Sequence, residues 1–343
     1  MLYSPQKTPE VAIVLCTHNG SQWIEEQIES IFAQTHPVAI RVFDDASSDD
    51  TVAMIQSKAA GHDVKCIIRD EALGVVNNFS NGIQRVLDEG FAYIALSDQD
   101  DIWSPDRIKT GLDVLKNAES SSSNKPHPCL AHSDLALVDA HNQIIHASFM
   151  KWRGYKTNAT KDLATILGQN GVMGNTILMN RAMAEVALPF PNDLHVHDYW
   201  IALVAELLGE RLYVNKPLVR YRIHGKNVSN SADTVVFESR RWVQKLSIKY
   251  LSRRDFVLPF KEDSRQNSLR FLLKDDRFTS LSANDRATIS AFLTYLNFQE
   301  SRLSIAVTVL KNRFLRPGIR HRLKVIGSIL TSRRYENVNS RNH

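Results

Sequence analysis

Three carboxylates stand within four residues, at Asp98, Asp100 and Asp101. They directly follow the apolar run 93–96, which predicts a short buried strand. Clustered carboxylates repel one another, and Mg²⁺ typically bridges one or two of them to substrate phosphates. The segment therefore predicts a metal that holds a nucleoside diphosphate. A solvated acidic turn ahead of the next helix explains these residues equally well when they are taken alone.

Polar side chains also follow two earlier apolar runs. Thr17 and Asn19 come after the first run, and Asp44 and Asp45 come after the second. A carboxylate at the carboxyl end of a strand can accept hydrogen bonds from a nucleotide base or a ribose hydroxyl. Asp44 and Asp45 stand too early to cap the next helix, whereas Asp49 is better explained as a capping residue. The chain has neither a Gly-x-Gly-x-x-Gly after the first strand nor a P-loop, so neither of those phosphate sites is expected.

Two candidates lie further along the chain. Asp198 opens a predicted helix beside Trp200, and taken alone it is better explained as an N-cap than as a catalytic base. As a base, it would have the Trp200 ring as an apolar wall against a sugar. His224 lies in the basic stretch 220–227, which could close over a diphosphate or could be a solvated loop.

Strand and helix alternate over the first hundred residues, and this order would position the polar residues. Strands are predicted at 11–16, 40–43, 64–68 and 93–96, with helices near 24–32, 49–58 and 76–86. Such alternation predicts an α/β fold with a mostly parallel sheet and helices on both faces. Further strands are predicted at 130–132 and 176–179, and the Ser-rich stretch 119–126 is interpreted as a surface loop.

The order of these motifs resembles glycosyltransferase family 2, whose members have the Rossmann-like GT-A fold. The matching elements are Thr17-His18-Asn19, the stretch from Asp44 to Thr51, and Asp98-Gln99-Asp100-Asp101. The segment 73–79 is similar to a further family motif. The segments 197–200 and 221–229 resemble the bacterial rhamnosyltransferase-like branch. The resemblance covers about residues 8–230.

The resemblance implies a role for individual positions. It implies that Thr17, Asn19, Asp44, Asp45, Asn78 and Asp98 bind the nucleotide sugar. It implies that Asp100, Asp98 and His224 hold Mn²⁺ or Mg²⁺, and that Asp198 is the general base. Gly174, Asn175 and Trp200 would lie on the acceptor side.

The resemblance also implies the reaction, an inverting transfer of a sugar from a nucleotide sugar to a polysaccharide or O-antigen-type acceptor. One base takes the proton of the acceptor hydroxyl, and the charge of the leaving diphosphate needs stabilisation. The resemblance favours dTDP-rhamnose as donor. The alternatives are a galactosyl- or glucosyltransferase that uses a UDP-sugar, and a non-catalytic scaffold module that binds a sugar nucleotide.

Charge is unevenly distributed along the 343 residues, whose formal net charge is +5. From Val236 onward there are 22 Lys and Arg against 9 Asp and Glu, a net charge of +13. The preceding residues carry 20 against 28, a net charge of −8. We therefore expect a catalytic domain over 1–230 and a basic helical region over 231–343. A basic region predicts an anionic partner.

The stretches 240–246 and 303–330 mix apolar and cationic residues, as helices that bind anionic lipid surfaces do. An ordinary helical subdomain is the alternative, and nucleic-acid binding is not expected because its motifs are missing. No apolar run is long enough to span a membrane, and the N-terminus has no signal-peptide core. Cys16 and Cys66 are expected to be buried free thiols. The expected location is the cytoplasm, with peripheral contact at the inner face of the cell membrane and a glycan or lipid-linked glycan as acceptor.

Overall fold

The computed structural model describes residues 9–123, 126–156, 161–192, 194, 196–224, 264–297, 300–315 and 319–331. The basic stretch 240–246 and the expected domain boundary near 230 lie outside the described residues. Residues 225–227 of the basic stretch 220–227 also lie outside the described residues.

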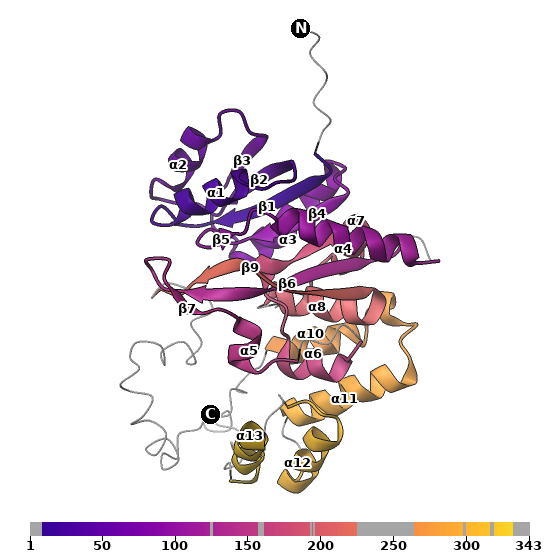
Figure 1. The fold of residues 1–343 in the computed structure, drawn as a ribbon. Coiled ribbons are helices and arrows are strands. Elements are labelled where there is room, and N and C mark those ends of the chain that lie inside the picture. Colours follow the sequence, from indigo (N-terminus) through magenta and orange to yellow (C-terminus); the bar gives the residue numbers. More distant parts are fainter. Residues whose placement is uncertain are drawn as a thin grey trace, which may run out of the picture.

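The described residues form one mixed sheet in the order β3-β2-β1-β4-β8-β6-β9-β5, with β7 paired to β6 (Figure 1). Strands β3, β2, β1 and β4 are parallel, β8 is antiparallel to both of its neighbours, and β9 is parallel to β6. The strands are β1 (Val11–Thr17), β2 (Val38–Asp44), β3 (Val64–Ile68), β4 (Tyr93–Ser97), β5 (Ile102–Trp103), β6 (Cys129–Val138), β7 (Ile144–His146), β8 (Leu178–Asn180) and β9 (Glu210–Arg222).

Helices cover both faces of this sheet, as the strand–helix alternation predicts. The helices of the first 224 residues are α1 (Ile24–Phe32), α2 (Thr51–Lys58), α3 (Val75–Asp88), α4 (Arg107–Ser121), α5 (Phe149–Arg153), α6 (Leu163–Gln169), η1 (Gly174–Thr176), α7 (Arg181–Ala187) and α8 (His197–Leu208). Those after residue 263 are α10 (Ser264–Leu272), η3 (Asp276–Phe278), α11 (Ala283–Asn297), α12 (Arg302–Lys311) and α13 (Ile319–Thr331).

The side chains of β1 show why the strand is apolar throughout. Ala12 and Val14 belong to a buried cluster that includes side chains of α3, α7 and α8. Val11, Ile13 and Leu15 belong to a second cluster, with side chains of α1 and α4. Alternate residues of a strand point to opposite faces, so a strand covered on both faces needs a continuous apolar run. This packing fixes the strand ends that carry the polar residues.

The C-terminal helices lie beyond α6 and α8, at one end of the molecule (Figure 1). Side chains of α10, α11 and α12 belong to the same buried cluster as α8. Trp200 of α8 packs edge-on against Phe271 and Phe278. The basic helical region therefore shares a hydrophobic core with the α/β part over the described residues.

Three expectations about local structure are wrong. Residues 119–121 of the Ser-rich stretch belong to α4 rather than to a loop. Residues 220–222 of the basic stretch belong to the 13-residue strand β9, which the sequence reading missed. The cysteines are free, but Cys16 and Cys66 are only half-buried, whereas Cys129 is buried.

Candidate active site

The predicted polar residues gather at one edge of the sheet. Strands β1, β2 and β4 are parallel, with Thr17 level with Asp44 and Leu15 level with Ser97. Their carboxyl ends therefore open on the same side, as expected for a ligand site in an α/β sheet. This edge brings together the segments that follow β1, β2 and β4.

Asp44 and Thr17 are bound to each other within the protein. The Thr17 hydroxyl donates to the Asp44 carboxylate at 2.7 Å, and the Ser47 amide donates to it at 2.9 Å. Both side chains are buried. The pair thus fixes the turn after β2, and any contact of Asp44 with a nucleotide would compete with these bonds.

Asp45 and Asn78 join the loop before α3 to the end of β2. The two carboxylate oxygens of Asp45 accept the backbone N–H groups of Leu73 and Gly74, each at 2.8 Å. The Asn78 amide donates to the Phe43 carbonyl at 2.8 Å. Both residues therefore hold the loop before α3 and the start of α3 against the end of β2.

Asn19 has a positive φ of 49°, a conformation that Asn tolerates better than most residues. Its side-chain oxygen accepts the backbone N–H of Ser48 at 2.9 Å, and its backbone N–H donates to Ser47 Oγ at 2.9 Å. The loops after β1 and β2 are therefore held against each other.

Gln99 is a site residue that the sequence reading missed. Its side chain accepts the His18 amide at 2.8 Å and donates to the His18 carbonyl at 3.0 Å. A Cβ added at Gly20 would lie 2.2 Å from Gln99 Oε1, so only glycine leaves room for this link. The sequence does not indicate this role, because Gln99 is an uncharged residue between two acidic residues and only the acidic residues suggest metal chemistry.

The acid loop, residues 98–101, concentrates negative charge. Burial, followed by the nearby carboxylates of Asp100 and Asp198, raises the pKa of Asp98 to about 7. Burial and the same crowding of charge raise the pKa of Asp101 well above its ordinary value, although hydrogen bonds from Asn175 and Arg222 oppose this. Such crowding is relieved by protonation or by a bound cation.

His224 meets the acid loop from the end of β9. Its Nε2 lies 2.9 Å from Asp100 Oδ2, and its ring stacks on Trp23 with the centroids 5.2 Å apart. Asp100 and His224 therefore lie together, as the resemblance implies for a metal site. The Trp23 contact was not anticipated, because an aromatic residue before a helix is usually a packing residue.

Arg222 does not close over a diphosphate as the basic stretch suggested. It is buried, it donates to the Asp100 carbonyl at 3.1 Å, and it pairs with Glu26 at 2.5 Å. Its guanidinium also lies over the Trp23 ring, 4.6 Å from the centroid. Arg222 therefore supports the acid loop from behind.

Asp198 lies in the first turn of α8, but it is not the N-cap, which is Val196. Its two oxygens accept the Asn170 side-chain amide and the Gly174 backbone amide, each at 3.2 Å. Burial raises the pKa of Asp198 to about 6, against the opposing effect of these hydrogen bonds. The charge of Asp198 also contributes to the raised pKa of Asp98, so the two carboxylates influence each other.

The turn η1 connects Asp198 to the acid loop. Gly174 donates to Asp198, while the side-chain amide of the next residue, Asn175, donates to Asp101 at 2.5 Å. The buried Arg107 donates to the Asn175 carbonyl at 2.7 Å and stacks on Trp103, 3.5 Å from the ring centroid. These contacts fix the distance between the base candidate and the acids.

Trp200 does not face the site. Its side chain is fully buried, and its indole N–H donates to the Ala187 carbonyl at 2.8 Å. The expectation that Trp200 lines the acceptor side is therefore wrong, because residues two positions apart on a helix, as Asp198 and Trp200 are, point to nearly opposite sides of it. Gly174 and Asn175 do lie beside Asp198.

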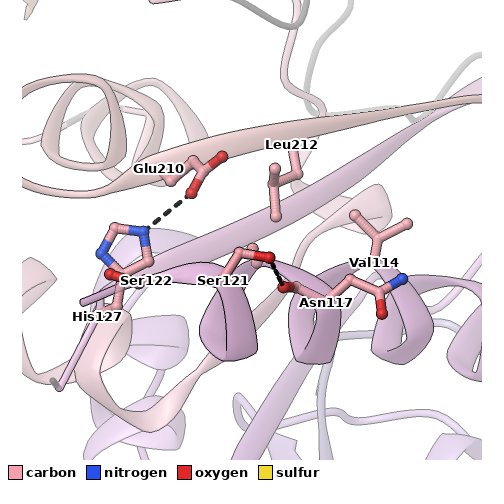
Figure 2. A pocket seen from close by; sticks show the side chains of 8 residues that line it. Val114, Asn117, Ser121, Ser122, His127, Glu210 and Leu212 are labelled. Atoms are coloured by element: carbon pink, nitrogen blue, oxygen red, sulfur yellow. Dashed lines mark hydrogen bonds and ion pairs between the residues drawn. The ribbon is translucent and has the colours of Figure 1, made fainter. Parts of the chain in front are cut away.

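A cavity of about 480 Å³ lies away from this site, between α4 and the start of β9 (Figure 2). Its lining includes His127 and Glu210, which pair at 2.9 Å. With Cys129 they place three potential ligand atoms within 4.8 Å of one another. In the register of the sheet, Cys129 lies near Tyr93, the first residue of β4. The cavity is therefore at the end of the sheet opposite to the carboxyl ends of β1, β2 and β4.

Known proteins resemble this chain in sequence and in fold. The family model "Glycosyl transferase family 2" matches residues 12–123. The dTDP-rhamnosyl transferase RfbG of Shigella flexneri is 30% identical over 224 residues, which cover 62% of this chain and 72% of RfbG. The putative teichuronic acid biosynthesis glycosyltransferase TuaG of Bacillus subtilis is 22% identical, over 65% of this chain and 82% of TuaG.

Two solved structures share the fold. TarS of S. aureus superposes with a TM-score of 0.56 at 12% identity, over 93% of this chain and 52% of TarS. The mannosyltransferase PcManGT of Pyrobaculum calidifontis, in complex with GDP-Man and Mn²⁺, gives a TM-score of 0.53 at 13% identity, over 96% of this chain and 83% of PcManGT. The chain spans about half of TarS. The sheet order, the motif order and the RfbG similarity agree, and this chain belongs to glycosyltransferase family 2 and is a glycosyl-transfer enzyme with a GT-A-like fold.

Proposed function

We propose that the chain is an inverting, metal-dependent glycosyltransferase that moves rhamnose from dTDP-rhamnose to a polysaccharide or O-antigen-type acceptor. The observation that carries the proposal is the η1 turn, which hydrogen-bonds to Asp198 through Gly174 and to Asp101 of the acid loop through Asn175. A separate base and an acid cluster held by one turn suit a single displacement at a sugar carbon.

Asp198 acts as the base in this proposal. Its carboxylate takes the proton of the acceptor hydroxyl while the acceptor oxygen bonds to the anomeric carbon. The bond from that carbon to the nucleoside diphosphate breaks on the opposite face, so the configuration inverts. Since the pKa of Asp198 is about 6, most molecules have an ionised Asp198 carboxylate at pH 7 that can accept a proton. The raised pKa also makes this carboxylate a stronger base than an ordinary aspartate.

The acid loop suits a hard divalent cation. Asp100 and His224 are in contact, and Asp98 is the third donor that we assign. Mn²⁺ and Mg²⁺ need only one or two carboxylates when phosphate oxygens and water complete the coordination. The crowded charge of Asp98 and Asp101 gives a cation a favourable place. When bound, the ion would neutralise the charge of the leaving diphosphate.

Residues around the acid loop would bind the rest of the donor and the acceptor. We assign Thr17, Asn19, Asp44, Asp45, Asn78 and Asp98 to the nucleotide-sugar side, and Gly174 and Asn175 to the acceptor side. Because Asp44, Asp45 and Asn78 are held by internal hydrogen bonds, they would act mainly by shaping the pocket wall. We also propose that the acceptor is a glycan or lipid-linked glycan at the inner face of the cell membrane.

A donor panel tests the proposal. Purified protein is incubated with dTDP-rhamnose, UDP-galactose or UDP-glucose, in Mn²⁺, Mg²⁺ or EDTA, and release of nucleoside diphosphate is measured. We expect release from dTDP-rhamnose that EDTA abolishes. Release from a UDP-sugar would replace the donor assignment, whereas binding of a sugar nucleotide without any release would favour the scaffold alternative.

The metal assignment has its own test by calorimetry. Asp100→Ala should abolish the Mn²⁺-dependent part of nucleotide binding while the fold is retained. Asp113→Ala removes an exposed carboxylate of α4 and serves as the matched control. Equal nucleotide affinity of the wild type in EDTA and in Mn²⁺ would rule out the metal role.

A further inference from the structure

The helix α12 is apolar on two faces. Ile305, Ala306 and Val309 are buried in the core. Leu303, Val307 and Leu310, at positions i, i+4 and i+7, form a second stripe that is exposed, with 69% of Leu303 accessible. A surface helix that packs through one face normally carries polar residues on the other, so the second stripe needs an explanation.

The neighbouring helix α13 continues this surface. It packs against α12, and the Arg302 side chain donates to the Leu330 carbonyl at 3.2 Å, which joins the end of α13 to the start of α12. Leu323 and Leu330 are exposed on α13, Leu323 to 66%. We call the side chains Leu303, Val307, Leu310, Leu323 and Leu330 the outer apolar surface.

The charge of this segment has one sign. Residues 301–331 contain seven Lys and Arg and no Asp or Glu. Lys311, Arg313 and Arg322, which lie in or directly after the two helices that carry the outer apolar surface, are exposed. Exposed apolar side chains with cationic neighbours, on helices too short to cross a bilayer, are what an anionic membrane surface binds. None of the helices described in the structure is long and apolar enough to span a membrane.

The surface is also tied to the proposed catalytic base. The Phe314 carbonyl, just after α12, lies where a Cβ on Gly168 of α6 would stand, only 1.9 Å away. Two residues further on, Asn170 donates to Asp198. The segment after α12 is therefore connected, through the close contact of Phe314 with Gly168, to the α6 end whose Asn170 binds Asp198.

We infer that the outer apolar surface docks the enzyme on an anionic lipid bilayer. The leucines and the valine enter the boundary between headgroups and acyl chains, and the neighbouring Lys and Arg contact lipid phosphates. The inference rests on the proposed function only for its biological purpose, which is access to a lipid-linked acceptor.

The test uses the full chain and vesicles without any nucleotide sugar. Co-sedimentation is measured with vesicles of phosphatidylglycerol and phosphatidylcholine, and with vesicles of phosphatidylcholine alone, across ionic strength. We expect binding to the anionic vesicles that weakens with salt. The double variant L303D/V307D should bind at least tenfold less, because it removes apolar side chains and adds negative charge.

The matched control is I68D/I144D, which makes the same kind of change at side chains exposed to 54% and 62% in β3 and β7. It should bind as the wild type does. Thermal melting of both variants should match the wild type, since all four positions are exposed. Equal binding by L303D/V307D and the control, or no binding by the wild type, would overturn the inference.

A second copy of the chain is the competing occupant. If light scattering shows a wild-type dimer that L303D/V307D converts to a monomer, and vesicle binding is absent, the surface is a dimer interface. Because the vesicle assay needs no sugar transfer, a failure here leaves the donor panel unaffected. A failed donor panel equally leaves lipid docking standing.

Discussion

Replacing Asp198 by Asn separates a catalytic role of this side chain from a purely structural one. Asn keeps the shape of the side chain, and its oxygen can still accept a hydrogen bond from Gly174, but it cannot take a proton. General-base catalysis contributes about 10²–10⁴-fold. We therefore expect transfer to fall by at least about 10²-fold, with nucleotide binding unchanged.

The same variant should lose activity without losing thermal stability at pH 7. Burial raises the pKa of Asp198 from its usual 3.8 to about 6, so the native state holds this proton more tightly than the unfolded chain does. Stability from this group is complete below pH 3.8 and is lost as the pH rises towards 6. A shift of about two units corresponds to at most about 3 kcal/mol. At pH 7, Asp198→Asn should therefore melt at or above the wild-type temperature, and this advantage should disappear near pH 4.

The wild-type pH profile gives an independent measurement. The free-enzyme kcat/KM should rise with pH to a half-maximal value near pH 6, because only the ionised carboxylate accepts a proton. At pH 5 about one tenth of the groups are ionised, so the rate should be about tenfold below its plateau. Near-normal turnover by Asp198→Asn, together with a lower melting temperature, would refute the base and favour a purely structural role.

Three further changes test parts of the structure. Asp49→Ala should lower the free energy of unfolding in urea at pH 7 by about 1 kcal/mol, because hydrogen bonds from Thr51 and Ser21 lower the pKa of Asp49 to about 2. Solvent exposure of Asp49 keeps this effect small, and Asp50→Ala should cost less. Glu206→Ala should cost about 3–5 kcal/mol because it leaves a buried arginine unpaired, whereas Asp113→Ala, in an exposed pair, should cost under about 1 kcal/mol by the same unfolding measurement. Gly20→Ala should weaken nucleotide binding in calorimetry at least fivefold, because the new methyl displaces the glutamine amide that links the loops after β1 and β4; unchanged affinity would contradict this.

The strand–helix order of the first hundred residues could be predicted from the sequence. Strand β3 begins and ends where the strand predicted at 64–68 does, and β1 and β4 each extend one residue beyond the predicted strand. β1 and β4 are buried on both faces, so the pattern that reports burial also reports their limits, whereas β3 is an edge strand without a fully buried residue. Placing Asp44 and Asp98 at one edge follows from parallel neighbours, which the alternation predicts.

Residues that act through partners distant in the sequence could not be predicted. Gln99 matters because it pairs with His18, 81 positions away, and Arg222 matters because it pairs with Glu26, 196 positions away. Strand β9 was missed because charged residues and Pro217 interrupt its apolar pattern, and its partner β6 lies some eighty residues earlier. Trp200 was misplaced because sequence adjacency to Asp198 does not set the direction in which a helical side chain points.

The division of the chain near residue 230 is a prediction that packing can test. Phe278 of η3 is buried, and its ring lies 5.9 Å from that of Trp200 in α8. If the C-terminal helices are part of one cooperative core, Phe278→Ala should destabilise the whole protein by about 3–5 kcal/mol. Circular dichroism and the loss of nucleotide binding should then follow one urea transition, shifted to a lower midpoint.

An independent C-terminal domain requires a different result. Only part of the helical signal would then shift, and nucleotide binding would be lost at the wild-type midpoint. Leu323→Ala, at an exposed position of α13, is the control and should leave both signals unchanged. Because Arg277, beside Phe278, also donates to the Leu188 carbonyl after α7 at 2.8 Å, we expect the single transition. Two separate transitions in the Phe278→Ala variant would show that residues 1–230 fold alone despite the shared core.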